Sequence, residues 1–411
     1  MAITKPSKPR PGVDRRALIF GGTVAGVSLA TGAAPAIGRN LPDIAVIGAG
    51  AFGGWTALAL REQGARVTMI DAYGPGNPRA SSGDESRLLR LSYGERDIYT
   101  RWAARAALLW QQRQGEFGRR LYYPNGGLRV MPAPELAAQR RVFDRLAIGY
   151  EVLTPGEVTH RWPQVRYDDA PAIFYEPTGG VVKARESMIA VAEMFARKGG
   201  TVRTGHAVLD GPSGTVMVDR EPLAAGSHVF ACGPWLPKVM PGLLGDRIRV
   251  PRREIFYVGS PIDDHRYRWE HLPNLADMDT YTASDIDYGI KVAAKLTDIA
   301  MDPDNGTRLP TAFLASQVQA YVAKRMPGLA GQPIVATRIC QTEYTDNNHF
   351  LIDRHPEHAN IWIAGGGSGH AFKMGPVLGD YISGRVLGHA FDPQEAALFS
   401  LARHGAAAAI A

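Results

Sequence analysis

A glycine-rich turn between an apolar strand and a helix constrains the fold of this chain more than any other feature. Residues 44–47 (IAVI) form an apolar run typical of a buried strand, and residues 48–53 (GAGAFG) follow directly, before a helical pattern. A second strand-like run, residues 66–70 (RVTMI), is closed by Asp71. This strand–turn–helix–strand pattern with an acid at its end predicts a dinucleotide-binding βαβ unit.

Each residue of this unit has its own expected role. Gly48 permits the tight turn, Gly50 lets the backbone approach a pyrophosphate, and Gly53 lets the helix and the strand pack closely. The helix N-terminus then faces the phosphates with the positive end of its dipole. Asp71 is expected to accept hydrogen bonds from the adenosine ribose hydroxyls. The turn alone does not distinguish FAD from NAD.

Composition excludes several classes of protein. The chain has 411 residues, of which 45% are apolar and 21% charged, so it is not a disordered polyelectrolyte. Its two cysteines exclude a disulfide scaffold and lack metal-site spacing, so we expect no metal. The formal net charge is +6, but residues 1–36 hold five basic residues and one acid, which leaves +2 for the rest. We therefore expect no nucleic-acid partner.

The N-terminal segment has the anatomy of a signal peptide. Residues 5–16 are basic, residues 17–30 are an apolar run, and residues 34–36 (APA) match a small-residue cleavage pattern. The paired arginines at 15–16 favour the twin-arginine export machinery. We expect residues 1–36 to be cleaved and the protein to be periplasmic or extracellular. The alternatives are an uncleaved anchor helix and an ordinary secretory signal.

Strand–helix patterns occur in separated parts of the chain, with strand-rich segments between them. The spacing of apolar residues predicts helices over 98–114, 185–198 and 376–387, and strands over 201–208, 215–218, 227–231 and 361–364. This pattern predicts an α/β fold with two domains (α+β). One is a Rossmann-like nucleotide-binding domain built from discontinuous segments, and the other is an inserted antiparallel-sheet substrate domain.

The domain boundaries follow from the same pattern. The expected nucleotide-binding segments are 41–125, 178–240 and 335–390. The expected substrate-domain segments are 126–177 and 241–334, and residues 391–411 form a C-terminal tail.

Further motifs occur in a fixed order: 82–90 (SGDESRLLR), 93–95 (YGE), 231–235 (ACGPW), 289–291 (GIK), Cys340 with 349–353 (HFLID), and 367–373 (GSGHAFK). Together with the glycine-rich turn, these motifs resemble the D-amino-acid-oxidase-like family of FAD-dependent amine oxidases. The resemblance is to the branch of monomeric sarcosine oxidase and N-methyltryptophan oxidase. It covers residues 43 to about 387 and implies FAD rather than NAD.

The resemblance implies that Cys340 bonds covalently through its sulfur to the flavin 8α carbon. Such a bond prevents loss of the flavin after export, whereas the alternative is a buried, unreactive thiol. Cys232 ends an apolar strand and is expected to be a small core residue. A disulfide between the two cysteines would compete with the flavin bond. Arg87 is expected to lie against the flavin ring.

The resemblance also places Lys291 near flavin N5, where it promotes the reaction with oxygen. A cation there stabilises the anionic products of electron transfer to oxygen. The alternative is a surface lysine. Lys295 stands four residues on, where sarcosine oxidases carry a histidine. Thr342 and Ser82 replace a tyrosine and a histidine, so sarcosine itself is not the expected substrate.

Arg90 and Lys373 match the pair that holds the substrate carboxylate in this family. An arginine fork fits a carboxylate bidentately, and lysine adds a point charge. Both residues together predict an amine substrate that bears an acid group. For Arg90, the alternative is a structural ion pair with Asp84 or Glu85.

Small residues before the last predicted helix are expected to let the flavin ring approach the backbone. Gly367 and Gly369 lie in this turn, and the helix that follows would stabilise the anionic reduced flavin with its N-terminus. His370 is expected to contact the flavin or the substrate, with packing in the core as the alternative.

The implied reaction is oxidation of the carbon next to a neutral amine. The product is an imine that water hydrolyses to a carbonyl compound plus an amine, and oxygen accepts the electrons to form hydrogen peroxide. Two other functions stay open: a flavin dehydrogenase that passes electrons to a quinone or carrier, and a non-catalytic FAD-binding partner protein.

Overall fold

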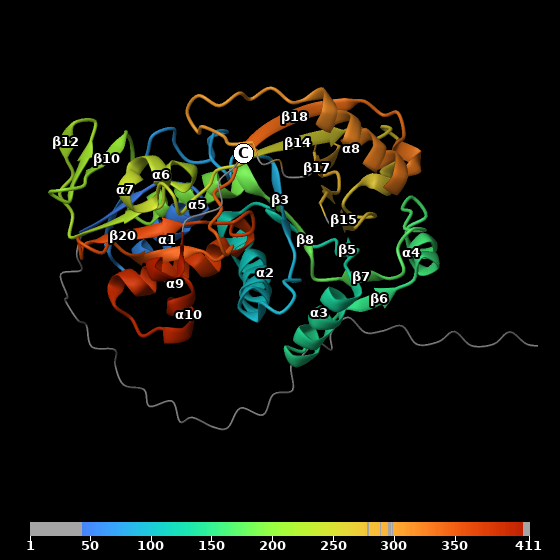
Figure 1. Ribbon diagram of the computed structural model, residues 1–411, viewed down its shortest axis with the longest axis horizontal. Coiled ribbons are helices and arrows are strands. Elements are labelled where there is room, and N and C mark those ends of the chain that lie inside the picture. The colour runs from blue at the N-terminus through green and yellow to red at the C-terminus, as the bar shows by residue number, and fades with distance from the viewer. Residues whose placement is uncertain (1–42, 278, 288, 295–296, 298, 406–411) are drawn as a thin grey trace, which may run out of the picture. The chain divides into compact units, whose positions relative to one another are not determined.

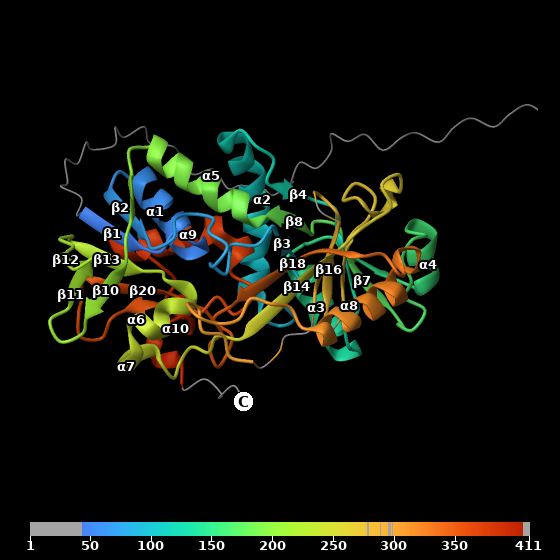
Figure 2. The same cartoon turned by 90° about the horizontal axis from the view of Figure 1, so that it is seen from above.

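The glycine-rich turn lies in a six-stranded sheet of the order β19-β20-β13-β1-β2-β9. Its strands are β1 (Asp43–Ile47), β2 (Arg66–Asp71), β9 (Thr201–Thr204), β13 (Ser227–Phe230), β19 (Leu351–Arg354) and β20 (Ile361–Gly365). All neighbours pair in parallel except β19, which is antiparallel to β20. Strands from both ends of the sequence therefore belong to one sheet (Figure 2).

The computed structural model describes residues 43–405 except 278, 288, 295–296 and 298. The expected signal peptide, residues 1–36, and Lys295 lie outside the described residues. In the part of the chain that is described, no helix has the length and hydropathy of a membrane span.

Helix α1 follows the turn and is buried along most of its length. It spans Ala51–Glu62 and packs against α5 (Ala184–Arg197) and α9 (Gly375–Leu387). The unbroken run Phe52–Leu60 is buried because the helix has neighbours on several sides. Helix α2 (Asp97–Phe117) packs in turn against α9. The sequence-based predictions for α2, α5 and α9 are therefore confirmed to within a few residues.

A second sheet has eight strands in the order β18-β14-β17-β16-β15-β5-β7-β6. These are β5 (Gly127–Arg129), β6 (Glu151–Leu153), β7 (Ile173–Glu176), β14 (Arg252–Val258), β15 (Asn274–Ala276), β16 (Tyr281–Ala283), β17 (Ile290–Ala293) and β18 (Ile334–Gln341). Figure 1 shows β14, β17 and β18 side by side. The sheet is antiparallel as predicted, except that β15 and β5 pair in parallel.

Strand β18 connects the predicted domains. The sequence assigned residues 335–390 to the nucleotide-binding segments, yet β18 pairs with β14 of the second sheet, whereas β19 and β20 belong to the first. This segment therefore contributes strands to both sheets. The exact domain boundaries stay a prediction.

Two small sheets, six further α-helices and several 3-10 turns complete the described fold. The sheets are β3 (Ser86–Leu89), β8 (Gly180–Lys183) and β4 (Tyr122–Tyr123), and β10 (Ala207–Asp210), β11 (Thr215–Val218) and β12 (Glu221–Pro222). The other helices are α3 (Ala133–Arg145), α4 (Pro155–Arg161), α6 (Leu236–Val239), α7 (Pro241–Leu244), α8 (Ala312–Arg325) and α10 (Pro393–Leu398). The expected mixture of helices and several sheets, an α/β fold, is confirmed.

Candidate functional site

The glycine-rich turn has the geometry that its sequence predicts. The Gly48 amide donates to the Ile70 carbonyl (2.7 Å), which ties the turn to β2, and Gly48 has a φ of +108°. A Cβ at Gly53 would lie 1.9 Å from the Gly48 carbonyl oxygen. The first turn of α1 lies so close to the glycine-rich turn that only a residue without a side chain fits at Gly53.

Asp71 organises the same turn from the end of β2. Its Oδ2 accepts from the Ala49 amide and its Oδ1 from the Tyr73 amide, each at 2.8 Å. Burial raises the pKa of Asp71, while these backbone hydrogen bonds oppose the rise. The carboxylate is thereby fixed at the cavity described next.

A cavity of about 640 Å³ opens beside this turn. Its walls include the predicted residues Gly48, Gly50, Asp71, Arg87, Cys340, Gly367, Gly369 and His370. Four predicted site residues are not among the described residues that line this cavity: Gly53, Arg90, Lys291 and Lys373. Both large sheets contribute to the walls, since Ile47 ends β1 and Cys340 lies on β18. One cavity therefore collects most of the residues that the sequence singled out.

Lys291 lies behind the wall in a buried charge cluster. Its side chain donates to Asp84 (2.5 Å) and to the Ser86 carbonyl, and the residue is 1% exposed. Arg87 and Tyr257 also donate to Asp84, each at 2.6 Å. Burial favours a raised pKa for Asp84, but the charges of Lys291 and Arg87 outweigh it and hold that pKa below its usual range. Two cations share one anion, so the cluster keeps a net positive charge beside the cavity.

The two cysteines are both free thiols in the described chain and both line the cavity. Burial raises the pKa of each, that of Cys232 to about 12. The Cys232 Sγ lies 3.6 Å from the Ile47 carbonyl oxygen, and the residue is only partly buried, so it is at the edge of the core where the cavity begins. Cys340 is opposite Arg253 in the β14–β18 pairing and is 7% exposed.

Arg90 and Lys373 meet at Tyr93. The Lys373 Nζ donates to the Tyr93 hydroxyl (3.0 Å) and to the His370 carbonyl (3.3 Å), while the Arg90 guanidinium lies 4.3 Å from the Tyr93 ring centroid. Burial and, next, the charge of Arg90 lower the pKa of Lys373 well below its usual value. Two basic groups therefore meet at Tyr93, and the described partners of Lys373 include no carboxylate that would favour its charged form.

Among the described side chains, Arg90 forms no ion pair with Asp84 or Glu85, so this alternative is wrong. Asp84 pairs with Lys291 and Arg87, and Glu85 pairs with Arg338. Arg90 donates instead to the Ser92 carbonyl. Its guanidinium therefore forms no ion pair with an acid among the described side chains, although its charge acts on the nearby Glu176.

Arg129 and Glu176 belong to the same cluster and were missed from the sequence. Arg129 Nη1 lies 3.3 Å from the Ser92 hydroxyl, and burial followed by the charge of Arg90 lowers the pKa of Arg129. Glu176 is buried and accepts from the amides of Leu91 and Ser92, both at 3.1 Å. Strands β5 and β7 bring these residues to Arg90, and no local sequence pattern signals it.

His370 faces the cavity as a neutral ring. Its Nε2 bonds the Asn348 carbonyl (3.0 Å), which only accepts, so Nε2 carries the proton and Nδ1 keeps a lone pair. Nδ1 is buried and has no partner within the described residues. Burial and, next, the charge of Lys373 lower the pKa of His370 well below its usual value. The ring therefore keeps one unused acceptor, which is buried among aromatic neighbours rather than open to the cavity.

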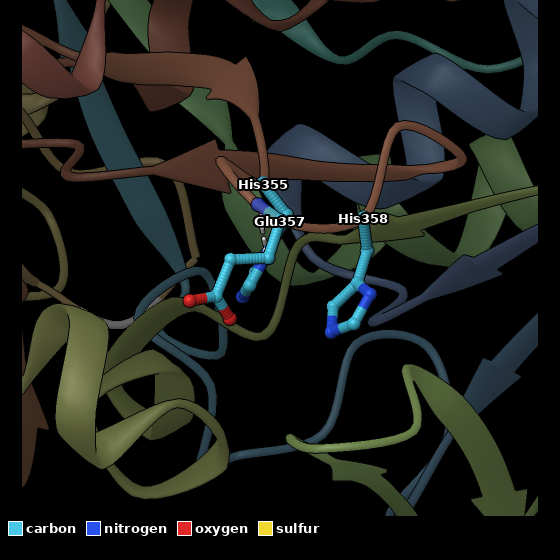
Figure 3. A group of neighbouring side chains, drawn as sticks. All are labelled: His355, Glu357 and His358. Carbon is cyan, nitrogen blue, oxygen red and sulfur yellow. Dashed lines mark hydrogen bonds between the residues drawn. The ribbon is translucent and has the colours of Figure 1, made fainter.

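A separate group of possible metal ligands lies between β19 and β20. Figure 3 shows His355, Glu357 and His358, whose ligand atoms lie within 4.8 Å of one another. The His355 Nδ1 accepts from the Glu357 amide (3.2 Å), and the His358 Nε2 bonds the Gly211 carbonyl (2.8 Å). The two rings stack at 4.7 Å, so their in-plane lone pairs do not converge. These contacts describe a turn that is linked to the β10–β11 hairpin, and we assign it no chemistry.

Comparison with known proteins identifies the family. A family model described as FAD dependent oxidoreductase matches residues 43–385. Monomeric sarcosine oxidase from Bacillus sp. (strain B-0618) is 26% identical over 83% of this chain and 91% of that protein. N-methyl-L-tryptophan oxidase from Salmonella dublin is 25% identical over 84% and 95%. The solved structure of glycine oxidase from Geobacillus kaustophilus has a TM-score of 0.75 at 19% identity, covering 89% and 100%.

The family model covers most of the chain, so this protein belongs to the family of FAD-dependent oxidoreductases. The predicted resemblance to sarcosine oxidase and N-methyltryptophan oxidase is confirmed by relatives of those names. The residues present also fit FAD. The turn excludes a side chain at Gly48, where a Cβ would lie 2.3 Å from the Ala231 carbonyl oxygen, and the cavity extends from this turn to Cys340.

Proposed function

We propose that this enzyme oxidises a secondary amine or an N-substituted amino acid that carries a carboxylate, and that oxygen accepts the electrons. The observation that carries the proposal is that the basic side chains of Arg90 and Lys373 meet at Tyr93, next to His370, without an ion-paired acid among the described residues. Relatives named for oxidation of sarcosine and of N-methyl-L-tryptophan agree with such a substrate. The reaction removes two electrons and two protons from the amine to give an imine. Oxygen accepts these two electrons and two protons and becomes hydrogen peroxide.

The substrate carboxylate would supply the anion that these two side chains lack. Arg129 is already ion-paired with Glu135 (3.1 Å), and the buried Glu176 accepts two backbone amides, whereas Arg90 and Lys373 form no ion pair with an acid among the described side chains. The partners of Lys373 are a tyrosine hydroxyl and a carbonyl. A bound carboxylate would be stabilised by Arg90 and would raise the pKa of Lys373, so that the amine takes up a proton from solvent and becomes a second cation.

The amine would be oriented by groups at the cavity wall. The carboxylate bound by Arg90 would fix one end of the molecule, and the part of the cavity wall that includes His370 would bound the other end. FAD, held by the glycine-rich turn, supplies the two-electron acceptor. No protein base is required when the amine binds in its neutral form.

Oxygen as the electron acceptor is supported by the charge cluster at Lys291. The cluster of Lys291, Arg87 and Asp84 has a net positive charge, and its member Arg87 lines the cavity. A positive charge in a buried site stabilises superoxide and peroxide as they form.

Two further parts of the proposal concern attachment and location. The thiol of Cys340 lines the same cavity, which supports a covalent bond to FAD through its sulfur. Residues 1–36 support export by the twin-arginine machinery, which places the enzyme in the periplasm or outside the cell. A covalent bond would retain FAD where none is available for replacement.

The test begins with acid-precipitated, unfolded protein. Yellow flavin absorbance should remain with the wild-type chain and with Cys232→Ala, and should be released from Cys340→Ala. Colour released from the wild type contradicts the covalent bond while leaving FAD binding intact. An amine screen then reads flavin bleaching and peroxide: bleaching without peroxide supports a dehydrogenase, and no bleaching by any acidic amine contradicts the proposed reaction.

A further inference from the structure

A buried acid lies in the wall of the FAD cavity without a cation to neutralise it. Glu343 follows β18, lines the cavity and is 4% exposed. Within the described residues its side chain forms no ion pair, and its carboxyl is hydrogen-bonded to Ser81, to the Gly367 amide and to its own backbone amide. A buried carboxylate needs either a cation or several donors, so its protonation state requires explanation.

The contacts of Ser81 decide where the proton lies. The Ser81 Oγ is 2.7 Å from the Gln341 carbonyl oxygen and 3.0 Å from the Glu343 Oε2. A carbonyl only accepts, so the single hydroxyl proton of Ser81 is used in the shorter bond. The contact between Ser81 and Glu343 then needs a proton from Glu343. A carboxylate there would leave two oxygen acceptors facing each other.

The second oxygen of Glu343 fixes the turn before α9. Its Oε1 accepts from the Gly367 amide (3.3 Å), and its backbone carbonyl accepts from the Ser368 amide (2.8 Å). A neutral carboxylic acid satisfies all of these contacts, because one oxygen accepts from Gly367 and the other donates to Ser81. Glu343 thereby links the Ser81 loop to the Gly367 turn.

The surroundings of Glu343 agree with this state. Titratable residues on the neighbouring segments include Arg79, Cys232, Cys340, Tyr344 and His370. Among the described side chains, none of these forms an ion pair with Glu343. Burial raises the pKa of Glu343, and only hydrogen bonds oppose the rise.

We infer that Glu343 is a neutral carboxylic acid in the folded enzyme, and that it is a positioning residue that joins two walls of the FAD cavity without adding negative charge. FAD carries an anionic pyrophosphate and gains negative charge on reduction. A carboxylate in the wall would oppose both, whereas the neutral acid holds the Gly367 turn in place at no electrostatic cost. This inference depends on FAD binding and not on the substrate or the electron acceptor.

The test compares Glu343→Gln with the wild-type holoenzyme by infrared difference spectroscopy. The amide reproduces the donor and the acceptor of a neutral acid, so E343Q should fold and retain its full FAD content. The wild type should show the C=O stretch of a protonated carboxyl at pH 7, shifted in D2O and absent from E343Q. Glu85→Gln is the matched control: Glu85 is ion-paired with Arg338 (2.8 Å), so the band should persist in E85Q.

Two further measurements separate positioning from simple packing. On raising the pH, the band should disappear and the flavin midpoint potential of the wild type should fall below that of E343Q, since the new carboxylate opposes reduction. Ser81→Ala removes the proton acceptor and should shift the band. Absence of the band at pH 7, or a failure of E343Q to fold or to hold FAD, would overturn the inference.

Discussion

Arg90 is the residue at which a single substitution tests the proposed substrate class most directly. Arg90→Gln removes a charge-assisted hydrogen bond to the substrate carboxylate, which contributes about 1.5–3 kcal/mol, or roughly 10- to 150-fold. We expect kcat/KM for acidic amines to fall by this factor, mainly through KM, with unchanged FAD content. Steady-state peroxide release measures it.

The control for this substitution is Arg105→Gln, which removes a surface ion pair with Asp380 and should leave kinetics unchanged. The esters of the same amines are a second control, because they lack the charge that Arg90 binds. An equal loss for acids and esters would contradict a role in carboxylate recognition.

Lys291 is the residue at which the electron acceptor is tested. Lys291→Met leaves Asp84 with Arg87 and Tyr257, so the net charge of the cluster changes from positive to neutral. We expect flavin reoxidation by oxygen to slow by about 10²- to 10³-fold while anaerobic reduction by the amine changes little. Stopped-flow absorbance measures both half-reactions, and Tyr257→Phe is the control that keeps the charges. Unchanged reoxidation would assign Lys291 a purely structural role.

Residues differ in how far the sequence could predict their place. Gly48, Gly53 and Asp71 belong to one local motif, so their geometry follows from spacing. Asp84 and Tyr257 are 173 positions apart and meet only through tertiary packing. Arg129 and Glu343 occur in strand-like segments of ordinary composition, and nothing local marks them as part of a charged cluster or of a cavity wall.

At the scale of elements, two helical glycines provide a matched pair. Gly53→Ala would place a Cβ 1.9 Å from a backbone oxygen and should displace the turn from α1, with loss of FAD and about 1–3 kcal/mol of stability. Gly115→Ala in α2 meets no described atom within 4 Å and should stabilise the protein by up to about 1 kcal/mol. Denaturant unfolding and flavin absorbance measure both. Equal FAD content in the two variants would contradict the role of the turn.

Elements were predictable where their pattern is local. The period of apolar residues predicted α2, α5 and α9 because each buries one face or more. Strand β18 was assigned to the nucleotide-binding segments because its neighbours in sequence belong there, yet it pairs with β14, more than seventy positions earlier. Strand pairing across such distances is decided by tertiary packing, and a single sequence does not show it.

At the scale of the whole molecule, the buried cluster at Asp84 predicts a pH dependence of stability. The folded-state pKa of Asp84 lies below its unfolded value of about 3.9. Its contribution is therefore present above about pH 4 and is lost as the pH falls through the lowered folded value. Asp84→Asn should cost about 3–5 kcal/mol at pH 7, with a difference from the wild type that narrows below pH 4.

Chemical denaturation of both holoproteins over this pH range measures the difference. Asp302→Asn is the control, because Asp302 pairs with Lys238 on the surface and should change stability by less than about 1 kcal/mol. A difference between wild type and Asp84→Asn that stays constant with pH would show that ionisation of Asp84 does not contribute.

The walls of the cavity come from residues between Ile47 and Phe372. During synthesis, a chain that has emerged from the ribosome only as far as residue 330 contains the glycine-rich turn but lacks Cys340, Gly367 and His370. Such a nascent chain cannot enclose FAD. The complete set of cavity walls therefore exists only once the chain has been synthesised through Phe372, the last residue in sequence that lines the cavity.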